Sequence, residues 1–475
     1  MVNLLTISPE IQRLICANLC RHCTGEPLDP NGPQQRQVSI FDGEEAFIMD
    51  KAKIRVAALS AMTLTCTTLR RIAQPHLYHY PSARAPAASK LLLRTLVERP
   101  NLAQYIDKLS VFDMKCWSLE DDLQTMLHVQ WNRDSKEKLI QEHKRDCDYY
   151  HSPLKPGKRI KFVKTKYDFV TAFTAIVLPF GTSLQILHLE LDEDRKFPSC
   201  KPGSLPRLKE LVVKGGEEVD IAVIAPIFNA APALERLGAY GLSCDDDWET
   251  TPRPPIHEGL KEIWLESCAI GPIGFPAFVG LFPRLEVFTY ETNGEGFGEE
   301  EEASLQQIGE ALLTCPDLRS LSIDFTKNHT GGEVWPAHEF GSISKLKKLQ
   351  RFRVRKLCMF RNIDNVDGPS TEPPLVKIYD MLPTSITELE VTRPNSFIFD
   401  DMLELSGMAT ERFPLLKHVS IDGIEQEWED DHSHRCSALM GLERINKLRQ
   451  AFGQNGIEVS TGDFGKYVGW ATLRA

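Results

Sequence analysis

From residue 184 onward, aliphatic residues recur at the spacing L-x-x-L-x-L. The fullest example, LKEIWLESCAI, begins at Leu260 and extends the spacing to L-x-x-L-x-L-x-x-C-x-L. Eight further matches begin at positions 184, 208, 234, 285, 318, 349, 386 and 416. The matches from 184 to 285 lie about 25 residues apart and the later steps are longer. Nine matches in one ordered series exclude a chance resemblance to the pattern.

Each match predicts a short buried strand that follows a helix. Apolar residues at helical spacing occupy the preceding stretches, such as SLQQIGEALLTCP, and a proline often stands just before the strand. Such a unit cannot bury its apolar face alone, whereas stacked units share one continuous core. We therefore predict an α/β solenoid over residues 184–460, with parallel strands on its concave face and helices outside.

Additional elements are expected at both ends of the array. The segment YIDKLSVF, with Ile106, Leu109 and Val111, is a candidate outlying first strand. At the other end, ALMGLERINKLRQAFGQNGIEV predicts a helix that stops near Gly453 and a short closing strand. This helix and strand would cap the array.

The N-terminal region has a different, purely helical pattern. In TISPEIQRLICANL, Ser8 is a predicted helix N-cap and Pro9 the first helical residue, followed by an apolar face that includes Leu14. A second helix is predicted in ALSAMTLTCTTLRRIAQ, with one apolar stripe that contains Met62, Cys66 and Ile72 and with Pro75 shortly after it. Residues 1–80 thus predict a helical module, with a flexible insert at about 24–50 that is rich in proline, glycine and amides.

The remaining segments are predicted to be connectors. Residues 81–183 form a helical linker with a basic loop, SPLKPGKRIKFVKTK, and residues 461–475 form a C-terminal tail. The domain order is therefore a helical module, a linker, a repeat array and a tail.

The N-terminal module resembles an F-box, whose usual opening is Leu-Pro-x-Glu-Leu followed by an isoleucine and a leucine on the first helix. The segment Ile7 to Ile11 falls on that opening, and Ser8 stands where the family usually has proline. The array resembles the leucine-rich-repeat family in its irregular form. An F-box joined to leucine-rich repeats is a recurrent eukaryotic architecture.

This resemblance implies that the chain is a substrate-receptor subunit of a cullin-type (SCF-type) ubiquitin ligase. The module would bind a Skp-family adaptor, which links to the cullin scaffold, by helix-in-groove recognition, and the repeats would hold a target protein. The alternative is a leucine-rich-repeat scaffold unconnected to ubiquitination, with the N-terminal helices as an ordinary cap that is buried against the repeats. The residues implied in adaptor binding are Ile7, Pro9, Ile11, Ile15, Leu19, Leu59, Leu64 and Leu69.

Strand periodicity predicts the target-binding face. In LQRFRVRK, alternation buries Phe352 and Val354 and turns Arg351, Arg353 and Arg355 outward together. Tyr240 and Trp264 are aromatic anchors on earlier strands, suited to an acidic or phosphorylated target segment. The alternative is an ion-pair ladder in which Glu388 and Glu390 of the next repeat neutralise the arginines.

Composition and motifs exclude several other classes of function. A net charge of -11 argues against a nucleic-acid binder, and no apolar run is long enough to span a membrane. No signal peptide is indicated, so we expect a cytoplasmic or nuclear protein with reduced cysteines. Phosphate-loop, nucleophile-elbow and zincin motifs are missing, so we expect no enzyme and no cofactor.

We also expect no metal. Cys20 and Cys23 form a lone C-x-x-C near Cys16 and His22, without a second ligand pair at zinc-finger spacing. The other candidate, His143 with Cys147 and His151, lacks such a pair as well. Buried small residues of the first helix are the simpler interpretation of Cys16 and Cys20.

Overall fold

A computed structural model describes the chain in several ranges. These are residues 7–24, 44–81, 91–111, 182–191, 201–244, 255–292, 303–325, 342–355, 377–392, 396–422 and 434–461, with short gaps inside the third, fifth and seventh ranges. The chain divides into two compact units, Met1–Leu211 with Asn229–Ala233, and Val212–Phe228 with Leu234–Ala475. Each is described by itself.

The N-terminal helices have the predicted start. The Ser8 hydroxyl accepts a hydrogen bond from the Ile11 amide at 3.5 Å, and Pro9 opens the helix, as its fixed φ favours. Leu59, Ile72 and Ala73 pack with Cys16 to form the core of the module. Its helices are α1 (Pro9–Leu19), α2 (Arg21–Thr24), α3 (Glu44–Thr65) and α4 (Thr67–Tyr78).

Three details of the module differ from the sequence prediction. The predicted second helix is two helices, because Cys66 adopts extended backbone and its sulfur caps the Leu69 amide at 3.5 Å. Helix α3 already begins at Glu44, within the range expected to be a flexible insert. Helix α4 continues through Pro75 to Tyr78. Local capping and tertiary packing thus set these boundaries, rather than the apolar stripe alone.

The repeat pattern corresponds to a single all-parallel sheet of eleven strands. Each of the nine matched patterns forms a strand that starts two residues after its first aliphatic position, and the outlying strand at Lys108 is also present. The fold is therefore α/β and compatible with a solenoid. The strands, in sheet order, are β1 (Lys108–Val111), β2 (Ile186–Glu190), β3 (Glu210–Lys214), β4 (Arg236–Tyr240), β6 (Glu262–Glu266), β8 (Val287–Thr292), β9 (Ser320–Phe325), β10 (Arg351–Arg355), β11 (Glu388–Thr392), β12 (His418–Asp422) and β13 (Glu458–Thr461).

Alternation along each strand divides the sheet into a buried face and an open face. In β6, Ile263 and Leu265 are buried, whereas Trp264 is only half-buried. Phe352 and Val354 of β10 are buried as predicted. We call the side that carries Trp264 and Arg353 the open face.

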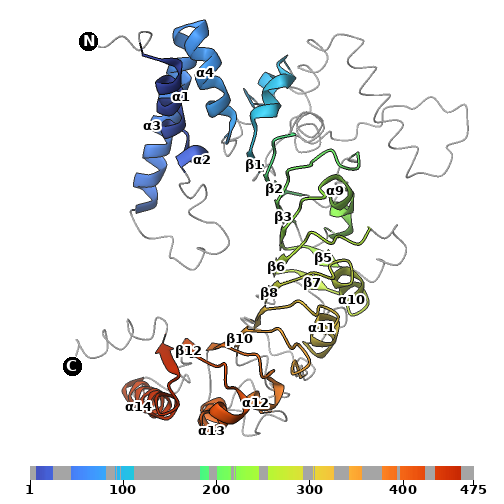
Figure 1. Cartoon of the computed structure of the whole chain (residues 1–475), viewed down its shortest axis with the longest axis vertical. Coiled ribbons are helices and arrows are strands. Elements are labelled where there is room, and N and C mark those ends of the chain that lie inside the picture. The colour runs from blue at the N-terminus through green and yellow to red at the C-terminus, as the bar shows by residue number, and fades with distance from the viewer. Residues whose placement is uncertain are drawn as a thin grey trace, which may run out of the picture. The chain divides into compact units, whose positions relative to one another are not determined.

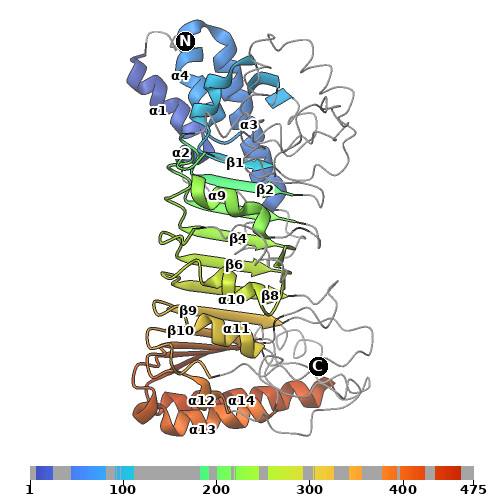
Figure 2. The same cartoon turned by 90° about the vertical axis from the view of Figure 1, so that its right-hand side faces the viewer.

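The helices between the strands lie on the buried side of the sheet, as Figures 1 and 2 show for α10, α11 and the later helices. Phe275 and Phe278 of α10 pack with Phe282 and Phe288 in this core. The predicted closing helix and strand are confirmed as α14 and β13. The connecting elements are η2 (Pro100–Tyr105), η3 (Ile221–Ile224), α9 (Ala225–Ala230), β5 (Ser243–Cys244), β7 (Ala269–Ile270), α10 (Gly274–Val279), α11 (Leu305–Leu312), α12 (Ile378–Met381), α13 (Ser396–Arg412) and α14 (His434–Gly453).

Several predictions fall outside the described residues. These concern the linker helices and basic loop between residues 112 and 181, the His143, Cys147 and His151 group, and the tail beyond residue 461. Among the helices in the described ranges, none has the length and apolar character needed to cross a bilayer.

Candidate functional site

Large apolar side chains of the helical module are exposed. On α1, Ile11 is 50% exposed and Leu14 is 62% exposed, and their spacing of three residues puts them on one helical face. On α3, Leu64 is 75% exposed, and Ile54 and Val56 are exposed as well. Exposed apolar side chains grouped in this way are candidates for contact with a partner.

The structure separates the adaptor-binding candidates into two groups. Leu59 and Leu69 are each only 2% exposed, so they stabilise the module and offer no contact surface. Leu19 packs against the module core. The remaining candidates are accessible to some degree: Ile7 and Ile15 are half-buried, and Pro9, Ile11 and Leu64 are exposed. Burial of the polar Gln12 and the small Cys16 on the inner face of α1 turns Ile11 and Leu14 outward.

The open face brings together side chains from strands far apart in the sequence. Register places Trp264 beside Gly238 on one side and Thr289 on the other. Further along, Ser322 neighbours Arg353, which in turn neighbours Glu390. Because Thr289 also pairs with Ser322, one continuous row crosses the sheet. Trp264 lies near one end of this row, and polar residues follow it. Tyr240 lies two residues after Gly238 on β4 and therefore faces the same side of the sheet. The Lys214 ammonium lies 5.8 Å from the centroid of its ring.

The arginines of β10 have different environments. Arg353 is half-buried, and its Nε lies 3.2 Å from Oε1 of Glu390, which is the ion pair expected from a ladder. Arg351 is exposed, opposite Glu388 in the register. The side chain of Arg355 lies outside the described residues. Arg353 therefore has a partner within the sheet, and Arg351 is the better candidate for contact with a target.

Acidic side chains gather next to Arg353 on the open face. Burial raises the pKa of Glu291, the Arg353 guanidinium opposes this shift, and the Asp324 and Glu266 carboxylates add to it. Glu266, Glu291 and Asp324 are register neighbours on three adjacent strands. The open face therefore carries both signs of charge, with three neighbouring carboxylates beside the Arg353 guanidinium.

A cluster of four metal-ligand side chains lies within the N-terminal unit. Helix α1 ends at Leu19 with Cys20 as its C-cap, and the chain turns at once into α2, which brings Cys23 to the same side as Cys20. His76 and His79, at the end of α4, face these cysteines. One donor atom from each of the four residues lies within 4.8 Å of every other. The sequence pattern alone predicts no metal here, because the histidine pair begins at His76, 53 residues after Cys23 and far beyond zinc-finger spacing.

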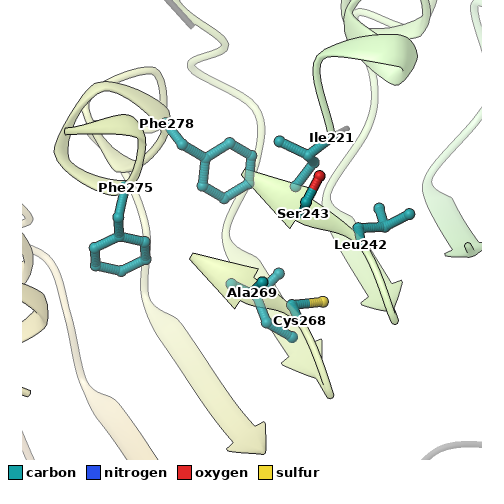
Figure 3. Close-up of a pocket in the computed structure, with 8 residues that line it drawn as sticks. Ile221, Leu242, Ser243, Cys268, Ala269, Phe275 and Phe278 are labelled. Atoms are coloured by element: carbon teal, nitrogen blue, oxygen red, sulfur yellow. The ribbon is translucent and has the colours of Figure 1, made fainter. Parts of the chain in front are cut away.

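A cavity among the described residues of the array is too small for a substrate. Its volume of about 10 Å³ is close to the minimum for one water molecule. Burial raises the pKa of the Cys268 thiol beside it to about 12, so this sulfur is no nucleophile at neutral pH. Figure 3 shows the aromatic rings of α10 and Ser243 of β5 around it. The lining residues are Ile221, Leu242, Ser243, Leu265, Cys268, Ala269, Phe275 and Phe278.

Comparison with known proteins adds no family name. No protein-family model matches the chain, and no curated protein matches it with significant similarity.

Proposed function

We propose that the chain is a substrate-receptor subunit of an SCF-type ubiquitin ligase. In this role the helical module acts as an F-box that binds a Skp-family adaptor, and the sheet is a leucine-rich-repeat solenoid that binds a target protein. The chain performs no bond chemistry. It holds the target within reach of the ubiquitin that the rest of the ligase transfers.

The observation that supports adaptor binding most strongly is the exposure of apolar residues on α1 and α3. Helix-in-groove recognition requires apolar side chains at helical spacing that are accessible before binding. Ile11 and Leu14 meet this requirement on α1, and Leu64 meets it at the end of α3. Leaving these side chains in water carries a cost that burial against a partner would remove, about 25 cal/mol for each Å² covered.

The open face of the sheet supports target binding. Parallel strands hold the side chains of adjacent repeats at fixed intervals, so that a rigid surface is formed from segments distant in sequence. Trp264 and Tyr240 are partly exposed aromatic residues on this surface, and residues of this type dominate binding energy at protein interfaces. Arg351 adds an exposed guanidinium that suits a carboxylate or phosphate on the target.

Co-purification tests the proposal. The full-length chain, co-expressed with a Skp-family adaptor and a cullin, should elute with both proteins in one complex of equal stoichiometry. Elution of the folded chain apart from the adaptor would favour the alternative, a repeat scaffold without a link to ubiquitination.

A further inference from the structure

The Cys20, Cys23, His76 and His79 cluster has the composition of a metal centre. Two of its donors are sulfurs and two are imidazole nitrogens, and the cysteines form no disulfide. We propose that these four side chains form a structural zinc site. This inference concerns the stability of the N-terminal unit and does not rest on the proposed function.

The distances between the donor atoms agree with tetrahedral coordination. The sulfur of Cys23 lies 3.3 Å from Nδ1 of His79 and 3.5 Å from Nδ1 of His76. The sulfur of Cys20 lies 3.7 Å from Nδ1 of His79. Zinc bonds of about 2.3 Å to sulfur and about 2.0–2.1 Å to nitrogen, at tetrahedral angles, place sulfur and nitrogen about 3.5 Å apart. The three observed separations bracket that value.

Local structure explains why the four donors converge. The amide of Thr24 donates to the carbonyl of Cys20 at 3.1 Å, and this single turn sets the two cysteines on one side of the chain. His76 and His79 are three residues apart at the end of α4, so they too share one side. Continuation of α4 through Pro75 is therefore what aligns the histidine pair with the cysteine pair.

The donor set selects zinc over other common cations. Calcium and magnesium prefer oxygen ligands, whereas a tetrahedral set of two sulfurs and two nitrogens suits zinc. On binding, each cysteine thiol releases its proton to solvent, and the two thiolates balance the dipositive charge of the ion. Four protein ligands complete the coordination, which is typical of structural rather than catalytic zinc sites.

The position of the cluster indicates what the ion would stabilise. The carbonyl oxygen of His79 accepts hydrogen bonds from the amides of Asp107 and Lys108, both at 3.0 Å, where β1 begins. The Asp107 carboxylate also lies 3.9 Å from Nδ1 of His79 and adds negative charge beside the site. Zinc would therefore connect the turn between α1 and α2 with the end of α4, directly beside the first strand of the sheet. It would stabilise a helical module whose hydrophobic core contains few buried residues.

Metal analysis of the full-length protein is the direct test. Protein purified without chelator should contain about one zinc per chain by inductively coupled plasma mass spectrometry, and Cys23→Ser with His76→Ala should lose at least about four-fifths of it. Cys66→Ser and His418→Ala are matched controls. Cys66 lies outside the cluster and serine preserves its capping role, while His418 lies on β12, so both controls should retain zinc.

Cobalt substitution keeps the test informative if a cluster variant fails to fold. Wild-type protein stripped of metal and supplied with Co²⁺ should show the intense visible bands of tetrahedral cobalt and a thiolate charge-transfer band, and its thermal midpoint should rise. A folded wild-type protein without zinc and without these bands would overturn the proposal and assign the four residues to thiol–imidazole hydrogen bonding. Stoichiometric iron in place of zinc would overturn the identity of the metal. Loss of adaptor binding alone would leave the zinc result unchanged, so the two proposals fail separately.

Discussion

The indole ring of Trp264 lies against Gly238, its register partner on the neighbouring strand. A Cβ added at Gly238 would come within 2.5 Å of this ring. Gly238 is buried although it belongs to the open face, because the ring covers it. The absence of a side chain at position 238 thus lets the indole ring of Trp264 lie close against the neighbouring strand.

Substitution at position 238 should therefore act through Trp264. We predict that Gly238→Ala lowers the free energy of unfolding by about 1–3 kcal/mol, the usual cost of overpacking. In a Trp264→Ala background the same change should be neutral or stabilising, which a double-mutant cycle by urea denaturation measures. Gly407→Ala is the control, since nothing lies within 4 Å of a Cβ there and alanine favours its helix α13. An equal loss in both backgrounds would show that the ring is not the cause.

The acidic group on the open face predicts a pH dependence. Because burial raises the pKa of Glu291, its contribution to stability is fully present below the carboxyl's unfolded pKa and is lost as pH rises through the higher folded pKa. Glu291→Gln should therefore raise the thermal midpoint at pH 8 and change it little at pH 4. The exposed Glu388→Gln is the matched control and should change the midpoint little at either pH. A larger gain at pH 4 than at pH 8 would contradict this reasoning.

Substitution of Arg351 should affect target binding, whereas substitution of Arg353 should affect stability. Arg351→Gln should reduce the amount of target protein captured from lysate, with an unchanged thermal midpoint, because Arg351 is exposed. Arg353→Gln should lower stability by a few tenths to about 1 kcal/mol, because its ion pair with Glu390 is partly exposed. Quantitative mass spectrometry of captured proteins and thermal scans of both variants provide the comparison. Reduced stability of Arg351→Gln with normal capture would instead assign Arg351 to the fold.

Much of the fold follows from local pattern. The aliphatic spacing predicts nine strands of the large sheet because burial of alternate residues requires it, although it does not predict the short strands β5 and β7. The capping chemistry of Ser8 predicts the start of α1. The break at Cys66 was not predictable from the apolar stripe, since the stripe continues through it. There, a backbone conformation and a single sulfur contact decide the boundary.

The candidate site was predictable only in part. Alternation indicates which side chains of β6 and β10 face outward, and the structure agrees for Trp264, Arg351 and Arg353. The apolar spacing of the helices does not show which face packs inward. The prediction that Leu59 and Leu69 bind the adaptor is therefore wrong, because both side chains lie in the core of the module. Donor groups that approach across the tertiary fold leave no short-range spacing in the sequence. The four-residue cluster is of this kind.

Binding between the full-length chain and a purified Skp-family adaptor tests the proposed function most directly. Isothermal titration calorimetry should give saturable binding of equal stoichiometry, and Ile11→Asp with Leu64→Asp should weaken it more than about 100-fold, because buried charges in an apolar contact are strongly unfavourable. Leu415→Asp is the matched control: Leu415 is 50% exposed, like Ile11, but precedes strand β12, and its substitution should leave the affinity unchanged. Binding that survives the double substitution in a folded chain, or no binding by the wild-type protein, would contradict the proposal.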